Sequence, residues 1–206
     1  MKLSKRTFTF LIGAVVIVFI GGYKIYSGSK VKPMDSIAAR SKGSAQAKVQ
    51  IIEFIDFECP ACAFGAKTLK EYMVKYPQDI RVQVKYFPLI KPHRHAMAVA
   101  LYSECAAQQG KFWEFHELLM PAQTLWSPLI SADAYFQGIA KQIGLNMPRL
   151  NACLSSDEAS KAINDDRSLG QSLGVQSTPS YFINNQMVVG VKSLEDQLKT
   201  YFPQNQ

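Results

Sequence analysis

The order of apolar runs along the chain predicts an α/β layered fold. A strand, a helix and a second strand come first, a block of helices follows, and a short hairpin with a closing helix comes last. This order is typical of a βαβ half and a ββα half that share one sheet, with helices inserted between the halves. At 206 residues, the chain is long enough for one domain with a full hydrophobic core and a tail.

The first half is predicted from two strands and the helix between them. Residues 49–57 are nearly all apolar, which is typical of a central strand buried on both faces. A helix is expected over residues 63–76. Residues 80–87 alternate between apolar and polar side chains and stop at Pro88, which predicts the second strand.

The rest of the chain is predicted as a helical block followed by a hairpin and a helix. Several of the helices are followed by a glycine or a proline, which commonly end a helix. The helices are expected over residues 95–108, 112–120, 131–143, 148–154 and 157–173. The hairpin is expected from strands 180–183 and 187–189 with a turn at Asn184 and Asn185, and the last helix over 193–201.

The basic charge of the chain is concentrated near its N-terminus. The net charge is +7, but eight basic residues and one acid lie before residue 43, which leaves fifteen residues of each sign beyond it. A nucleic-acid-binding domain needs a basic face on the fold itself. Nucleic acid is therefore not expected as a partner.

An uncharged apolar run near the N-terminus predicts export. Lys2, Lys5 and Arg6 precede residues 7–23, a run at the short end of what spans a bilayer, and no small-residue cleavage site follows directly. We expect residues 1–26 to be a cytoplasmic tip and an uncleaved transmembrane signal anchor in the inner membrane. The folded domain would then lie on the periplasmic side. Secretion to the periplasm after signal cleavage is the alternative.

Composition also predicts where the folded domain begins. Residues 27–47 are rich in Ser, Gly, Ala and Lys and are expected to form a flexible tether. Residues 48–206 are then the folded domain, with the helical insert at about residues 92–174.

Cys59-Pro60-Ala61-Cys62 is the motif that carries chemistry. Two cysteines three positions apart at a helix start lie on one face and can reach each other. Free backbone N–H groups and the helix dipole stabilise a thiolate at the first position. Cys59 is therefore expected to be the attacking sulfur and Cys62 the resolving one.

Metal binding is the alternative use of this pair. A zinc site would need two more ligands, and the chain has no second CxxC. A copper site formed by the pair with His93 or His95 stays open from the sequence. Both histidines lie near a predicted helix start, where a capping or surface position is expected, so no metal or other cofactor is predicted.

Thr178-Pro179 lies immediately before the predicted strand at residue 180. A proline there is compatible with a cis peptide bond or with the first position of a strand. Since about 5% of X–Pro bonds are cis, the residues alone favour a trans bond.

Together these residues resemble the DsbA type of thioredoxin-fold thiol–disulfide oxidoreductase. The resemblance rests on Phe57 and the Cys59–Cys62 motif after a strand, and on residues 174–184 around Pro179. The inserted helices are similar around Cys105, residues 109–116 and Cys153. It covers essentially residues 48–201 and implies a thioredoxin-like fold with an inserted helical subdomain.

The resemblance also implies roles for single residues. It implies a cis Thr178–Pro179 bond that faces the CxxC, offers the Thr178 backbone to a substrate chain and shields the thiolate from metals. Glu53 would be a buried acid beneath the active site with a raised pKa, able to take the proton of Cys62. Asp56 and Glu58 are expected to be solvated.

The remaining cysteines, Cys105 and Cys153, are expected to form a structural disulfide. Export and the similar pairs in related sequences favour this over two buried free thiols. A disulfide between them would close a loop of about 49 residues, a stabilisation of about 4 kcal/mol on the chain-entropy model.

These expectations indicate an enzyme that oxidises exported proteins. The Cys59–Cys62 disulfide would pass to reduced substrate proteins, and a quinone-linked membrane partner would reoxidise the pair. Strongly oxidising family members have a histidine where this chain has Ala61, which predicts a milder oxidant. The alternatives are a disulfide isomerase or reductase of the same fold, and a copper-handling metallochaperone.

Overall fold

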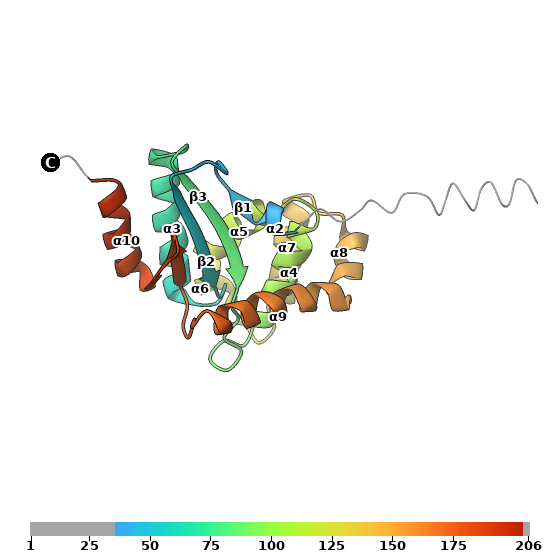
Figure 1. Ribbon diagram of the computed structural model, residues 1–206. Helices are drawn as coiled ribbons and strands as arrows, with labels where there is room; N and C mark the ends of the chain where they lie inside the picture. The colour runs from blue at the N-terminus through green and yellow to red at the C-terminus, as the bar shows by residue number, and fades with distance from the viewer. Residues whose placement is uncertain (1–35, 204–206) are drawn as a thin grey trace, which may run out of the picture. The chain divides into compact units, whose positions relative to one another are not determined.

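The computed structural model describes residues 36–203, and its centre is a five-stranded mixed sheet in the order β1-β3-β2-β4-β5 (Figure 1). β2 (Val49–Ile55) is the middle strand, as the apolar run predicts. It pairs in parallel with β3 (Ile80–Tyr86) and antiparallel with β4 (Ser180–Ile183), which in turn pairs with β5 (Gln186–Val189). β2 ends two residues before the expected position because the chain turns at Asp56, whose carbonyl accepts from the Cys59 N–H at 3.1 Å.

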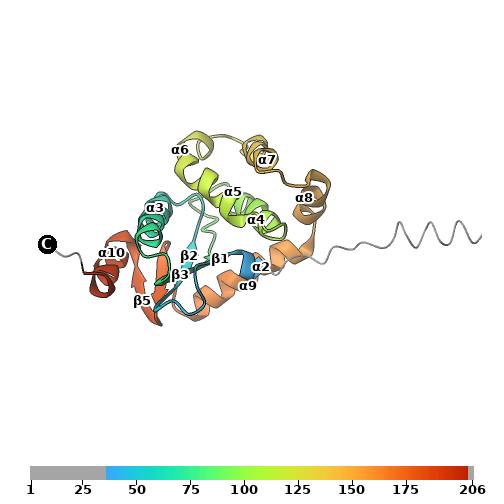
Figure 2. The same ribbon diagram turned by 90° about the horizontal axis from the view of Figure 1, so that it is seen from above.

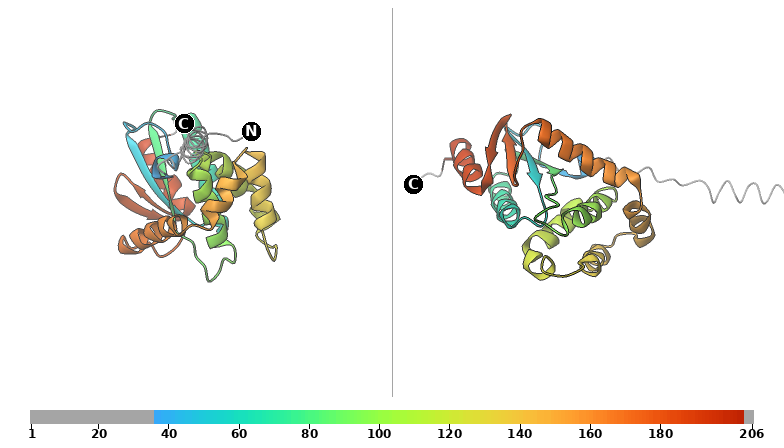
Figure 3. Two further views of the ribbon diagram at one scale, coloured as in Figure 1. Left: turned by 90° about the vertical axis from the view of Figure 1, so that its right-hand side faces the viewer. Right: turned by 90° about the horizontal axis from the view of Figure 1, so that it is seen from below.

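Helices cover both faces of this sheet, so the predicted α/β layers are confirmed. Figure 2 shows α3 (Pro60–Lys75) and α10 (Gly190–Tyr201) together on one side of the sheet. The right-hand view of Figure 3, from below, shows α9 (Asp157–Ser172), in orange, on the other side. α9 packs directly on β3. The last helix of the predicted insert therefore also forms a layer of the α/β sandwich.

The inserted helices follow the predicted order, with two additional short ones. Proline in the first turn of a helix loses no hydrogen bond, so Pro121 lies inside a new 3₁₀ turn that begins at Met120, where the sequence suggested only a helix end. The trace continues directly into α6. The elements between β3 and α9 are α4 (Ala96–Ala107), α5 (Phe112–Leu119), η1 (Met120–Ala122), α6 (Gln123–Trp126), α7 (Asp133–Gln142) and α8 (Met147–Leu154).

The prediction of a flexible tether over residues 27–47 is wrong for residues 36–47. This segment forms α2 (Ser36–Ala39) and the edge strand β1 (Ser41–Lys42), which pairs antiparallel with β3 through Ser41 and Gln83. The predicted anchor, residues 1–26, and the tether up to residue 35 lie outside the described residues. Within residues 36–203, no helix is both long and apolar enough to cross a membrane.

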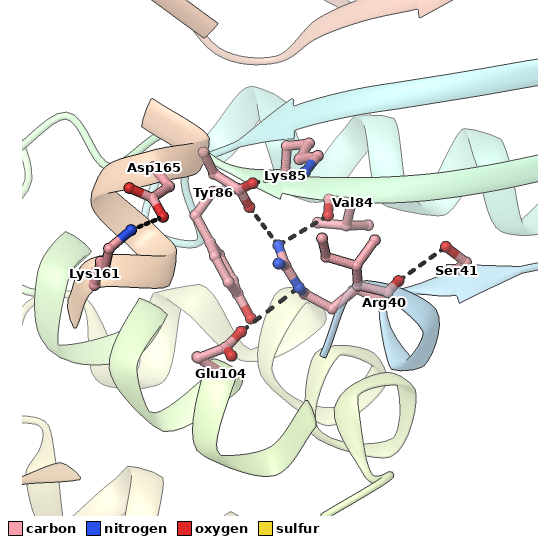
Figure 4. A network of polar contacts seen from close by, with 10 residues as sticks. Arg40, Ser41, Val84, Lys85, Tyr86, Glu104, Lys161 and Asp165 are labelled. Carbon is pink, nitrogen blue, oxygen red and sulfur yellow. Dashed lines mark hydrogen bonds and ion pairs between the residues drawn. The ribbon is translucent and has the colours of Figure 1, made fainter. Parts of the chain in front are cut away.

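Arg40 is the residue that ties this segment to the fold, and it is only 1% exposed (Figure 4). Its guanidinium donates to the Val84 carbonyl at 3.1 Å and forms an ion pair with Asp166 of α9. It also lies 3.6 Å from Glu104 of α4 and over the ring of Tyr86. Arg40 therefore belongs to the folded domain although the composition around it is typical of a linker, because its partners lie far along the chain.

A disulfide joins α4 and α8 within the insert. The Cys105 and Cys153 sulfurs lie 2.02 Å apart, and the two Cα atoms 5.7 Å apart. The bond ties residues separated by 48 positions, so it restricts the unfolded chain strongly.

We predict that replacing both Cys105 and Cys153 by alanine lowers the free energy of unfolding by about 4 kcal/mol, the entropy of closing a loop of this length. Urea denaturation followed by circular dichroism measures the loss. The matched control replaces Cys59 and Cys62 by alanine, which removes two cysteines without opening this loop. A loss of less than about 1 kcal/mol in the first variant would contradict the prediction.

Candidate active site

The turn from β2 into α3 places Cys59 at the N-terminus of the helix. Cys59 is the N-cap residue, with φ −72° and ψ 119°, and Pro60 occupies the first turn of α3. The Cys59 carbonyl accepts from the Cys62 N–H at 3.0 Å, which starts the helix. Both thiols are free. Cys59 is 8% exposed to solvent, and Cys62 is fully buried. An incoming reagent can therefore reach only Cys59.

The two thiols differ strongly in acidity. A hydrogen bond from Cys62 is the main cause that lowers the pKa of Cys59 to about 5, against partial burial, and Thr178 and the N–H groups of Cys62 and Ala61 act in the same direction. Burial raises the pKa of Cys62 well above its ordinary value. Cys59 is thus the thiolate at neutral pH, and Cys62 keeps its proton.

We predict that iodoacetamide alkylates the reduced protein at Cys59 alone, with a rate that follows a single titration centred at about pH 5, the pKa of Cys59. Below this pH the thiol is protonated and the rate falls. Mass spectrometry of the labelled peptide identifies the site. Cys62→Ala removes the hydrogen bond to Cys59, so the midpoint should rise in that variant. A midpoint near 8.5 in the unmodified protein, as in a free cysteine, would contradict the prediction.

The Thr178–Pro179 loop lies against Cys59. The Thr178–Pro179 bond is cis, as the resemblance implies and contrary to the trans bond that the residues alone favour. The Cys59 sulfur lies 3.4 Å from the Thr178 carbonyl, to which the protonated thiol donates, although 119 positions separate the two residues. A backbone acceptor therefore lies beside the reactive sulfur, where a substrate chain would approach.

Glu53 lies beneath the cysteine pair on β2 and is 2% exposed. Burial raises the pKa of Glu53 to about 8, and the nearby Tyr181 hydroxyl acts in the opposite direction. Glu53 Oε1 and the Tyr181 hydroxyl oxygen are buried without a hydrogen bond of ordinary geometry. A Cβ at Gly65 of α3 would meet the Tyr181 hydroxyl at 2.1 Å, so this glycine lets α3 pack closely on both side chains. The negative charge of Glu53 further raises the pKa of Cys62. A carboxyl that titrates near neutral pH thus lies within electrostatic reach of the resolving thiol.

Asp56 and Glu58 are buried, so the expectation that they are solvated is wrong. Asp56 is 1% exposed, and its Oδ2 accepts from the Leu89 N–H and contacts His93 Nδ1, both at 2.7 Å. Glu58 is 7% exposed and accepts from the His95 N–H at 2.6 Å. Both carboxylates bind the loop before α4, whose main-chain donors leave no pattern in the sequence.

The histidines are used in packing and hydrogen bonding. His95 is the N-cap residue of α4, which agrees with the expected capping position, although its side chain makes no capping hydrogen bond and lies buried with Nε2 2.9 Å from the Leu129 carbonyl. His93 is half-buried and pairs with Asp56. His116 packs against the rings of Phe57 and Trp113. In the part of the chain that the structure describes, no group of three potential metal ligands gathers. The geometry therefore offers nothing specific to the copper alternative.

Gln123 is a site residue that the sequence did not reveal. Its side chain extends from α6 and donates to the Phe57 carbonyl at 2.6 Å and to the Cys59 carbonyl at 3.0 Å. Gln123 lies between the helices predicted over residues 112–120 and 131–143, and a glutamine there carries no signal of its own. The insert thus contacts the active-site turn directly.

Comparison with known proteins adds the family. The family model described as "Thioredoxin" matches residues 35–200. This chain belongs to the thioredoxin family. The match begins at residue 35, which agrees with a fold that includes α2 and β1. A free CxxC pair at a helix start, opposite a cis-proline, makes this thioredoxin-family chain a thiol–disulfide oxidoreductase.

Solved structures show the same fold at low sequence identity. BdbD from Bacillus subtilis superposes with a TM-score of 0.68 at 20% identity, over 82% of this chain and 94% of that one. The thiol-disulfide exchange protein alpha-DsbA2 from Wolbachia pipientis gives 0.66 at 21%, over 81% and 88%. A thioredoxin-like oxidoreductase from Silicibacter pomeroyi gives 0.64 at 23%, over 83% and 98%. The thioredoxin-like fold with inserted helices is therefore shown.

The curated relatives carry another name. Na(+)/H(+) antiporter NhaA 3 from Salinispora tropica is 29% identical over 163 residues, which is 79% of this chain and 24% of that protein. NhaA 1 from Mycolicibacterium vanbaalenii is 27% identical over 188 residues, or 84% and 30%. This chain spans only 24% and 30% of the lengths of these two relatives.

Proposed function

We propose that this thioredoxin-family protein passes a Cys59–Cys62 disulfide to reduced proteins outside the cytoplasm. The observation that carries the proposal is the contrast between the lowered pKa of Cys59, at about 5, and the raised pKa of Cys62. A stabilised thiolate favours the reduced pair, which makes the disulfide the stronger oxidant. The stabilising groups are Cys62, Thr178 and backbone N–H groups, so a histidine in place of Ala61 is not required.

The reaction exchanges one disulfide for another. A substrate thiolate attacks the Cys59 sulfur, the Cys59–Cys62 bond breaks, and Cys62 leaves with the electron pair. The neutral carboxyl of Glu53 supplies the proton that Cys62 needs, because a buried thiolate with a raised pKa is a poor leaving group. A second substrate thiolate then attacks the substrate sulfur of the mixed disulfide. It releases the oxidised substrate and the Cys59 thiolate.

Export and membrane attachment belong to the same proposal. The basic and apolar residues 1–26 favour a signal anchor, and the Cys105–Cys153 disulfide is typical of an oxidising compartment. A quinone-linked membrane protein would restore the Cys59–Cys62 disulfide after each cycle. An anchored enzyme would meet such a partner in the plane of the membrane.

Oxidation of a dithiol peptide by the oxidised protein tests this function. Cys59→Ser, which cannot form the active-site disulfide, is expected to abolish turnover. Cys62→Ser mixed with the disulfide form of the peptide is expected to accumulate a mixed disulfide, because Cys59 attacks the peptide disulfide and no Cys62 thiol is present to resolve the bond. Full turnover in Cys59→Ser would overturn the proposal. The reduction potential sets the direction: a value well above about −270 mV, that of thioredoxin, supports an oxidase, and a value at or below it supports a reductase.

A further inference from the structure

Three successive residues of the active-site turn contact the inserted helices. The Phe57 ring packs on Phe112 and His116 of α5, with ring centroids 6.4 and 5.8 Å away. The Glu58 carboxylate accepts from the His95 N–H at the start of α4. Gln123 of α6 then reaches the carbonyls on either side of Glu58. The insert therefore surrounds the turn that leads into the CxxC.

Among these insert residues, Gln123 contacts Cys59 itself. Its amide nitrogen has two hydrogens, which match the two carbonyl acceptors, at 2.6 Å for Phe57 and 3.0 Å for Cys59. The Cys59 carbonyl also accepts from the Cys62 N–H at 3.0 Å and the Ala63 N–H at 3.4 Å. The same carbonyl thus joins the first turn of α3 to the insert.

Gln123 and Trp126 of the same short helix are buried and hydrogen-bonded. Gln123 is 8% exposed, and its amide also lies 3.9 Å from the Met120 sulfur. Trp126, three positions on, is fully buried and donates to the Leu119 carbonyl at 3.2 Å. An amide fixed in this way can hold the orientation of the turn rather than follow its movements.

We propose that Gln123 is a positioning residue for the thiol chemistry. By holding the carbonyls of Phe57 and Cys59, it keeps Cys59 in the orientation in which its sulfur faces the N–H groups at the start of α3. This inference rests on the proposed function, since it concerns the reactivity of the same cysteine.

A variant without the amide should expose this role. Gln123→Met keeps the length and the burial of the side chain but donates no hydrogen bond. The Phe57 carbonyl loses this buried donor, so the turn should shift toward other partners and Cys59 should lose part of its contact with the helix N–H groups. We expect the alkylation midpoint of Cys59 to rise by about one pH unit, which lowers the alkylation rate at pH 5 about fivefold and leaves the rate at pH 8 unchanged.

The matched control is Gln109→Met. Gln109 also lies in the insert and bridges two backbone groups, the N–H and the carbonyl of Asn146, at 2.9 and 3.4 Å. None of its hydrogen bonds involves the active-site turn. Its replacement should leave the Cys59 midpoint unchanged. An unaltered midpoint in a folded Gln123→Met, or an equal rise in Gln109→Met, would overturn the inference.

A second measurement needs no variant and covers the case in which Gln123→Met does not fold. In the unmodified protein, the side-chain amide resonances of Gln123 should titrate with the Cys59 midpoint, whereas those of Gln109 should not. Gln123 side-chain resonances that do not shift as Cys59 ionises would contradict the positioning role of Gln123. Because alkylation and this titration report the thiolate itself, their failure is distinct from a failure to oxidise peptides, which would overturn the proposed function.

Discussion

Replacing Glu53 by glutamine is expected to slow peptide oxidation about 10²–10⁴-fold, the usual contribution of a positioned acid or base. Glutamine keeps the size and the polarity of the side chain but cannot pass a proton to Cys62 as it leaves. Stopped-flow kinetics of the oxidised protein with a dithiol peptide measures the loss. Wild-type turnover in the variant between pH 6 and 8 would show that Glu53 does not transfer this proton.

Glu53→Gln should slow turnover but raise the free energy of unfolding. Burial raises the pKa of Glu53 from 4.5 to about 8, so between these values the folded protein keeps a proton that the unfolded chain releases. Stability therefore falls as pH rises through this window, by about 1.4 kcal/mol for each pH unit. Glutamine has no proton to lose, so Glu53→Gln should gain a few kcal/mol over the wild type between pH 5 and pH 8.

Urea denaturation at a series of pH values checks this second effect. The control is Glu71→Gln on α3. The Glu71 side chain is 67% exposed, so it lacks the burial that raises the pKa of Glu53. It should leave both turnover and the pH dependence of stability as they are. If Glu53→Gln slows turnover and also raises stability above pH 7, the buried carboxyl serves the chemistry rather than the fold.

Replacing Arg40 by methionine is expected to cost about 3–5 kcal/mol of unfolding free energy, as is usual when one member of a buried ion pair is removed. Arg40 lies between Glu104 and Asp166, which are 1% and 5% exposed, and Lys85 also contacts Asp166, with its Nζ 2.7 Å from the carboxylate. The variant removes the positive charge that lies between two buried carboxylates. Methionine keeps most of the apolar volume, so lost packing contributes little.

Urea denaturation again provides the measurement, and Arg149→Met is the control. Arg149 lies on the exposed side of α8, where a surface substitution usually changes stability by less than about 0.5 kcal/mol. A similar, small loss in both variants would mean that the Arg40 contacts add no net stability.

The sequence predicted those elements whose signals are local. β2 follows from a run of apolar residues that must be buried on both faces, and α3 from the pattern after the CxxC. The cysteine roles follow from the chemistry of a helix start, which depends on neighbouring residues only. The same holds for the hairpin of β4 and β5, where Asn184 and Asn185 adopt positive φ angles of 45° and 72°.

Features that depend on distant partners could not be predicted in this way. Arg40 looked like part of a linker because its partner Asp166 lies 126 positions away. Asp56 and Glu58 looked solvated because the groups that satisfy them are main-chain N–H groups of Leu89 and His95. Gln123 belongs to the same class. The cis bond before Pro179 needed the resemblance, since the residues alone favour the commoner isomer.

The burial of Arg40 also sets the smallest fragment that can fold as this protein does. A fragment that begins at residue 48, where composition places the domain boundary, would lack β1 and the guanidinium that joins β3, α4 and α9. Its sheet would end at β3 with an open edge, and the buried carboxylates of Glu104 and Asp166 would lose their contacts with the Arg40 guanidinium. Recombinant work on the catalytic part therefore needs to retain the chain from at least residue 36.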